Sequence, residues 1–442
     1  MRFRIALFSR SITRLTILSL VASCAMFFSP IQVEASTEMR LIKESVDPAI
    51  PTIPGNPDNP YNAIDHGIVG PSVNETYHTV FPDDIKSDRL VVVLGSGQEG
   101  AIILQETLHK LAENQTVLVL QQEEVELTLT VEWVQAILEQ QHPVLASLRI
   151  LLTKVKASEG KELVKQVGAE QFAKVDLLSE VWNIATVWIG KDNSEQTPNP
   201  FASPLKLSLP HRVNGGQAFL GLYSLLGGGK VEYVRGTANG NRIEGSLLHE
   251  GRYAVLTYEK TFDDVPTTNW AAEAIRMLAA TQVVKGVGNS SFAPGQQVTR
   301  AEFTALLARA SGIEEADELT FEDVKPSDWY AGIVAGAAKA GLVEGVAARK
   351  FAPEAVMTRE EMAVLLVRTY AWKVGNRVQS EVSSLYVDEG QVADWAKEAV
   401  RIAAKLKLMV GRGNNTFAPQ GEVSRAESAQ AIYNFMKMTE LL

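Results

Sequence analysis

The sequence predicts a multidomain α+β protein, in which a β-rich middle domain is followed by an all-α region of three repeats. Three observations favour this class. The chain has 442 residues, more than one ordinary hydrophobic core accommodates. Short apolar or alternating runs dominate residues 86–260. Residues 261–438 repeat one pattern three times, with the spacing of amphipathic helices.

The composition is that of a folded globular protein, with 46% hydrophobic and 21% charged residues. The net charge of -10 and the lack of a dense Lys/Arg run after residue 40 argue against nucleic-acid binding, because phosphate backbones need a basic surface. An anionic sugar is not excluded, since a few well-placed arginines can bind it without a basic surface overall.

Residues 1–35 are predicted to be a signal peptide. Four arginines precede an apolar stretch at 15–28, and Val33-Glu34-Ala35-Ser36 suits cleavage after Ala35. No later segment reaches the roughly eighteen apolar residues of a membrane span, so we expect an exported protein without a transmembrane segment after cleavage. The single cysteine, Cys24, lies in a sequence that resembles a lipobox. Lipidation at Cys24 is the less favoured alternative, because apolar residues follow it.

Residues 36–85 are predicted to be an extended leader or linker. Regularly spaced prolines from Pro48 to Pro60, mixed with Asn, Gly and Asp, prevent helices and interior strands from propagating.

Residues 86–260 are predicted to be a β-rich domain of unknown function. Two helices are expected within it, at 101–111 and 131–139. Strands are expected at 90–94, 117–120, 125–129, 148–152, 184–189, 205–209, 230–234 and 253–258.

The three repeats are predicted to occupy residues 261–312, 320–375 and 385–438. Each copy has a tryptophan at the start of its first helix, then a turn glycine, a Phe-Ala-Pro sequence and an arginine at the start of its second helix. The tryptophan and the arginine are 30 residues apart in every copy. One helix-turn-helix unit cannot bury its apolar faces alone, so we expect the three to pack together. These residues are Trp270, Trp329 and Trp395; Gly286, Gly345 and Gly411; and Arg300, Arg359 and Arg425.

These motifs, Phe-x-Asp-Val, the tryptophan, Gly-x5-Phe-x-Pro and Thr-Arg-Ala-Glu, resemble the S-layer homology family over roughly residues 262–438. The resemblance implies a pseudo-threefold arrangement with binding grooves between neighbouring repeats. It also implies non-covalent anchoring of an exported protein to the bacterial cell wall. The implied partner is a secondary cell-wall polysaccharide attached to peptidoglycan and ending in a pyruvylated amino sugar.

The Thr-Arg-Ala-Glu motif divides into two roles. Its first and last residues are typical of a capping box, which predicts helix-capping roles for Thr299, Glu302, Thr358, Glu361, Ser424 and Glu427. The arginine lies where the helix dipole disfavours a cation, and beside free helix amides it could bind a carboxylate or phosphate. The alternative is an ion pair with Asp263, Asp323 or Asp388.

The other repeated residues have two interpretations each. The tryptophans either belong to the core or stack on sugars. The glycines are turn residues whose amides face the groove in the binding interpretation. The second repeat has Ala347-Ala348-Arg349-Lys350 in place of a polar turn, so we expect its groove to be altered and favour Arg300 and Arg425 as ligand contacts.

No catalytic set, metal site or cofactor is predicted. Gly95-Ser96-Gly97-Gln98-Glu99-Gly100 mimics a dinucleotide-binding loop, but a hairpin at 117–129 and the lack of further βα units argue against it. The histidines show no metal-ligand spacing. Two alternatives stay open for residues 86–260: a displayed wall-modifying or glycan-cleaving enzyme, and a self-assembling S-layer or adhesion module.

Overall fold

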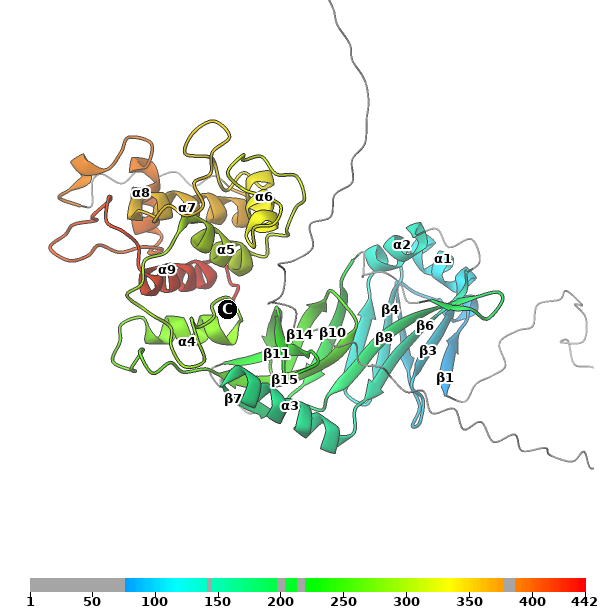
Figure 1. Ribbon diagram of the computed structural model, residues 1–442. Coiled ribbons are helices and arrows are strands. Elements are labelled where there is room, and N and C mark those ends of the chain that lie inside the picture. The colour runs from blue at the N-terminus through cyan, green and yellow to red at the C-terminus, as the bar shows by residue number, and fades with distance from the viewer. Residues whose placement is uncertain (1–75, 141–144, 197–202, 213–218, 377–385) are drawn as a thin grey trace, which may run out of the picture. The chain divides into compact units, whose positions relative to one another are not determined.

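The computed structural model describes residues 76–140, 145–196, 203–212, 219–376 and 386–442 (Figure 1). The predicted signal peptide, Cys24 and most of the predicted leader lie outside these residues. The first strand, β1 (Tyr77–Val80), lies inside the segment predicted to be a leader.

Within the described residues, one mixed sheet has nine strands. Its main path is β1-β3-β6-β8-β15-β11-β12, with β7 paired to β15 and β9 to β8. The pair β1 and β3 is parallel, and the other pairs are antiparallel. The strands after β1 are β3 (Gly100–Leu104), β6 (Leu145–Lys154), β7 (Lys174–Leu177), β8 (Trp182–Gly190), β9 (Glu195–Gln196), β11 (Leu220–Leu225), β12 (Val231–Val234) and β15 (Gly251–Glu259).

A second mixed sheet has six strands in the order β13-β14-β10-β5-β4-β2. Here β2 and β4 are parallel. Burial alternates along β5, β10 and β14, as expected for strands with one face in a core. The strands are β2 (Arg89–Val93), β4 (Val117–Gln122), β5 (Val125–Leu129), β10 (Leu205–Pro210), β13 (Gly236–Asn239) and β14 (Arg242–Leu247).

The two sheets share one hydrophobic core. Ile103 and Leu148 of the first sheet belong to the same buried cluster as Leu120 and Leu207 of the second. The helices α1 (Gln105–Glu113) and α2 (Val131–Glu139), which lie side by side in Figure 1, add apolar side chains to this cluster. Helix α3 (Ala157–Gln171) packs on β7 and β11, and a short helix η1 (Pro82–Asp84) contacts α1.

The predicted strands at 90–94, 117–120, 125–129, 148–152, 184–189, 205–209, 230–234 and 253–258 correspond to observed strands, and the helix at 131–139 is confirmed. The helix predicted at 101–111 is wrong in its first half. Residues Gly100–Leu104 form β3, and α1 begins only at Gln105. The reason is close packing: a Cβ at Gly100 would lie 1.9 Å from the Ile150 carbonyl oxygen, so the chain pairs tightly with β6 there.

Each repeat contains two main helices, and the second helices of the three repeats contact one another. The first helix of each repeat packs on the second helix of the preceding repeat: α6 on α5, α8 on α7 and, closing the circle, α4 on α9. The helices are α4 (Ala272–Ala280), α5 (Arg300–Ser311), α6 (Ala331–Lys339), α7 (Arg359–Val374), α8 (Lys397–Lys405) and α9 (Arg425–Met438), with a short helix η2 (Glu389–Gln391).

A ring of backbone hydrogen bonds joins the residues just before the second helices. The amide of Val298 donates to the carbonyl of Val423, that of Val423 to Met357, and that of Met357 to Val298, each at 3.0 Å. All three side chains are fully buried. No repeat can therefore complete its own hydrogen bonds without the other two.

The predicted fold class, separate β-rich and all-α domains, is wrong. The described residues fall within one compact unit. Ala280 of α4 belongs to a core cluster with Tyr223 and Leu256 of the sheet, and the Tyr223 hydroxyl donates to the Ala280 carbonyl at 3.0 Å. The repeats also contain β-bridges, such as Thr299 with Val356, because their entry segments are extended. The apolar contacts between the sheet and the repeats, and the extended entry segments of the repeats, leave no periodic pattern in the sequence. The sequence therefore could not predict them.

Candidate functional site

A capping box begins each second helix. Thr299, Thr358 and Ser424 accept a hydrogen bond from the backbone amide three residues later, at 3.2, 3.4 and 3.2 Å. Glu302, Glu361 and Glu427 accept from the cap amides at 2.9, 2.9 and 3.0 Å. These bonds fix the first helical turn and with it the direction in which the adjacent arginine leaves the helix.

Each arginine reaches into the turn of the next repeat. The Nε atoms of Arg300, Arg359 and Arg425 donate to the phenylalanine carbonyls of the Phe-Ala-Pro turns at 3.0, 2.8 and 2.9 Å. Each guanidinium also lies over the ring of that phenylalanine. The acceptors are Phe351, Phe417 and Phe292, so the contacts run from the first repeat to the second, the second to the third and the third back to the first.

The arginines differ in their carboxylate partners. Arg300 donates to Glu361 at 3.0 Å and Arg359 to Glu427 at 2.8 Å. Arg425 forms no salt bridge among the described residues; its Nη2 donates to the Lys285 carbonyl. Burial lowers the pKa of all three arginines. Nearby carboxylates act in the opposite direction, Glu361 on Arg300, Glu427 on Arg359, and Glu302 and Asp264 on Arg425. Arg425 thus differs from the other two in having no carboxylate in direct contact among the described residues.

The aspartates that we considered as arginine partners have another role. The carboxylates of Asp264, Asp323 and Asp388 accept from the two backbone amides of each Phe-Ala turn at 2.7–2.8 Å. The exposed Asp263, named as an alternative partner, is one residue away from this position. The arginines pair with glutamates of the neighbouring repeat, a contact that spacing within one repeat cannot predict.

The glycines and tryptophans occupy different surroundings. A Cβ on Gly286, Gly345 or Gly411 would come within 2.5–2.6 Å of a turn carbonyl oxygen, so only glycine fits there. The tryptophans lie on the surface, where Trp270, Trp329 and Trp395 are 63%, 60% and 61% exposed. Their indole faces are therefore available to a ligand rather than used in the core.

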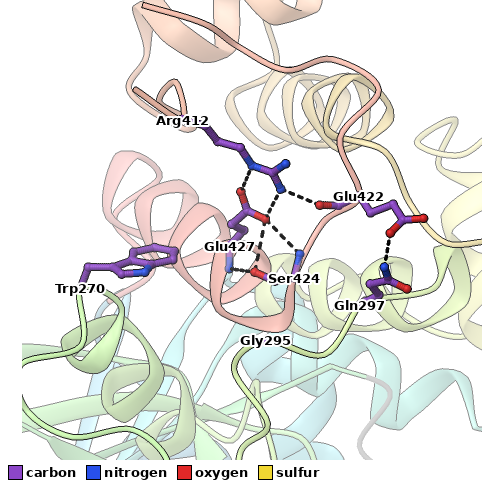
Figure 2. A pocket seen from close by; sticks show the side chains of 7 residues that line it. All are labelled: Trp270, Gly295, Gln297, Arg412, Glu422, Ser424 and Glu427. Atoms are coloured by element: carbon purple, nitrogen blue, oxygen red, sulfur yellow. Dashed lines mark hydrogen bonds and ion pairs between the residues drawn. The ribbon is translucent and has the colours of Figure 1, made fainter. Parts of the chain in front are cut away.

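A surface groove of about 430 Å³ joins the first and third repeats (Figure 2). Figure 2 shows the Arg412 and Glu427 side chains facing each other, with Trp270 on one side and the hydrogen-bonded pair of Gln297 and Glu422 on the other. An adjoining hollow of about 380 Å³ shares Trp270, Arg412 and Glu427. It also contains Arg359 and Gly411, so three of the predicted polysaccharide-binding residues, Trp270, Arg359 and Gly411, come together here with the predicted capping residue Glu427.

Arg412 is the groove residue that our sequence analysis missed. Its guanidinium donates to Glu427 at 2.8 and 2.7 Å and to the Glu422 carbonyl at 2.6 Å. The hydrogen bond to Glu427 raises the pKa of Arg412. The equivalent positions are the exposed Val287 and Val346, so aligning the repeats one residue beyond the glycine would have revealed this difference.

Glu427 lies between two guanidinium groups, those of Arg359 and Arg412. Burial acts to raise the pKa of Glu427, but hydrogen bonds from Arg412 and Ser424 and the charge of Arg359 outweigh it, and the net pKa is lowered. The adjoining hollow, which Arg359, Arg412 and Glu427 line, therefore has two cations and one carboxylate, a balance that suits an anionic group.

The part of the chain that the structure describes contains no group of three or more His, Cys, Asp or Glu side chains arranged to hold a metal ion. None of its helices is both long and apolar enough to cross a membrane.

The three repeats form a cyclic helical module with a surface groove, and comparison with known proteins identifies the family of this module. The model of the S-layer homology domain matches residues 261–304, 320–363 and 385–429. The chain therefore carries three tandem S-layer homology domains, as the sequence motifs predicted.

The chain is also similar to several larger proteins. It is 37% identical to an amylopullulanase from Thermoanaerobacterium thermosulfurigenes over 211 residues, which is 48% of this chain and 11% of the relative. Exoglucanase XynX from Acetivibrio thermocellus is 38% identical over 45% of this chain and 18% of its own length. The S-layer protein sap of Bacillus anthracis is 32% identical over 39% of this chain and 21% of its own. The similarity thus covers about a tenth to a fifth of each relative.

Proposed function

We propose that the three S-layer homology domains anchor this protein at the cell surface by binding an anionic polysaccharide of the cell wall in the grooves between repeats. Two findings support a surface-anchoring role. The family model matches three S-layer homology domains, and the chain is similar both to an S-layer protein and to two enzymes named for different reactions. The observation that carries the proposal is the hollow in which the exposed Trp270 of the first repeat adjoins Arg359 of the second repeat and Arg412 of the third.

The groove has the chemistry that an acidic sugar requires. The indole of Trp270 offers an apolar face on which a pyranose ring can stack. The two arginines provide the charge for a carboxylate, such as the ketal carboxylate of a pyruvylated amino sugar. Gly411 lines the same hollow, so its backbone would lie next to a ligand bound there. By the cyclic repetition, Arg300 with Trp395 and Gly345, and Arg425 with Trp329 and Gly286, occupy the equivalent positions and are the proposed contacts at the other two repeat boundaries.

The test is retention of the full-length mature protein on purified cell-wall sacculi. Trp270→Ala and Arg412→Val each remove one groove contact without emptying a core, since both side chains reach the surface. We expect each to weaken retention by about tenfold, which corresponds to roughly 1.4 kcal/mol. Sacculi stripped of their non-peptidoglycan polymer should retain neither the wild type nor the variants.

Trp372→Ala is the matched control, because Trp372 is 43% exposed and lies outside the groove. It should bind like the wild type. Equal retention of Trp270→Ala, Arg412→Val and wild type would reject the groove, and undiminished binding to stripped sacculi would reject the polysaccharide as the ligand.

A further inference from the structure

The β-sheet part of the molecule has a hollow of its own, of about 250 Å³, formed by connections from both sheets. Glu123 and Glu124 come from the β4–β5 turn, Lys154 from the end of β6 and Glu180 from the β7–β8 connection. His211 and Arg212 follow β10. The volume is slightly below the roughly 300–1,000 Å³ of pockets for drug-sized ligands.

His211 is the feature of this hollow that the fold does not explain. Its side chain is 7% exposed, and neither Nδ1 nor Nε2 has a hydrogen-bond partner among the described residues. By contrast, the half-exposed His249 engages both nitrogens, Nδ1 with the Glu250 carbonyl at 2.7 Å and Nε2 with Glu232 at 3.0 Å. A buried polar group without partners costs free energy, so a ligand that satisfies the imidazole is favoured.

The backbone around His211 is held firmly even though its ring is not. The His211 amide donates to the Asn241 carbonyl at 2.7 Å, and the Arg212 amide to the Leu178 carbonyl at 3.0 Å. Arg242 donates to the carbonyl of Glu124 at 2.6 Å. These bonds fix the connections that line the hollow, which makes it a preformed site.

The charges of the hollow exclude an anionic ligand. Lys154 pairs with Glu123 at 3.1 Å and Arg212 with Glu180 at 2.5 Å. Glu124 leaves three carboxylates against two cations, so the excess is negative. The hollow thus offers hydrogen-bond acceptors and an imidazole whose two nitrogens have no partner among the described residues.

We propose that this hollow binds one unit of a neutral, hydroxyl-rich carbohydrate. Sugar hydroxyls both donate and accept, which matches an imidazole without partners and paired carboxylates better than an ion does. The size of the hollow suits a single sugar ring. The site is independent of the grooves between the repeats, which favour an anionic ligand, and it does not rest on the proposed anchoring function.

The experiment is saturation-transfer NMR and calorimetric titration of the full-length mature protein with cellotriose, maltotriose and chitotriose. We expect at least one of them to bind and His211→Leu to weaken it at least tenfold. Because His211→Leu also removes an unsatisfied buried polar group, the variant should unfold at a temperature no lower than that of the wild type. Loss of binding would then not reflect loss of fold.

His109→Leu is the matched control, since His109 is exposed on α1 and lies outside the hollow. It should bind like the wild type. The proposal is overturned if none of the three sugars binds at millimolar concentration, if His211→Leu binds as tightly as the wild type, or if a simple amine or inorganic phosphate binds in place of the sugars.

Discussion

The arginines at the starts of the three second helices are adjacent to capping boxes but serve the neighbouring repeat. Arg300 and Arg359 are 5% and 3% exposed, and each joins a phenylalanine carbonyl and a glutamate across a repeat boundary. A buried guanidinium without a carboxylate is costly. Glu361 and Glu427 therefore each have two roles: they cap their own helix and neutralise the arginine of the preceding repeat.

This double role predicts unequal effects of one substitution in two repeats. Glu427→Gln should lower the free energy of unfolding by roughly 3 kcal/mol, the low end for breaking a buried ion pair, because Arg359 then loses its carboxylate. Glu302→Gln should cost under about 1 kcal/mol, since glutamine still caps a helix and the Glu302 carboxylate acts on Arg425 only through its charge, without a salt bridge in the described structure. Urea unfolding of both variants checks this, and equal losses would contradict it.

At the scale of elements, the Phe-Ala-Pro turns are built on strained alanines held by aspartates. Ala293, Ala352 and Ala418 have φ of 56, 59 and 57°, in the left-handed region that a Cβ disfavours. In each turn, the amide of this alanine donates to an aspartate. The phenylalanine carbonyl of the same turn accepts the arginine, so the aspartate indirectly positions the cation.

The aspartates make the turns sensitive to acid. Burial acts to raise the pKa of Asp323, but hydrogen bonds from the Phe351 and Ala352 amides outweigh it and lower the pKa in the folded state. The stabilisation is therefore present above the unfolded pKa of about 3.9 and is lost as the pH falls through the lower folded value. Below about pH 4, the unfolding free energy should drop less steeply in Asp323→Asn than in the wild type.

Urea titrations between pH 7 and pH 3 give the two slopes. Asp263→Asn is the control, because Asp263 is exposed and outside the turn contacts, and its slope should match that of the wild type. A wild-type slope in Asp323→Asn would contradict the assignment of acid sensitivity to this turn.

At the scale of the whole molecule, the repeats form a closed circle rather than a stack. Helix α4 of the first repeat packs on α9 of the last, and the Val298 amide needs the Val423 carbonyl. In an open stack, removing a terminal repeat would leave the others folded. In this circle, every repeat is a neighbour of every other.

A chain ending at residue 376 should therefore lose the fold of its remaining repeats. Hydrogen exchange of this truncated chain should show unprotected amides in α4 and α5, whereas amides of the paired strands β6 and β8 keep their protection as an internal control. Protected α4 and α5 amides in the truncated chain would show that two repeats suffice.

The sequence by itself determined the elements and their repetition. Alternating polar and apolar residues and short apolar runs located eight strands, and the motifs with their constant spacing from tryptophan to arginine identified the repeat family. Those signals are local, because side-chain periodicity reports which face of one element is buried. The helix predicted at 101–111 failed for the same reason: a short apolar run does not reveal that β6 lies close enough to require Gly100.

Only the tertiary structure decided which residues from distant parts of the chain contact one another. It showed that Arg359 meets Glu427 of the next repeat, that Arg412 enters a groove with Trp270, and that the buried ring of His211 has no hydrogen-bond partner among the described residues. These contacts join residues from separate repeats or separate sheets, and their distance along the chain carries no periodic signal. The predicted separation of a β-rich domain from an all-α anchor failed because shared apolar burial is a property of the folded molecule.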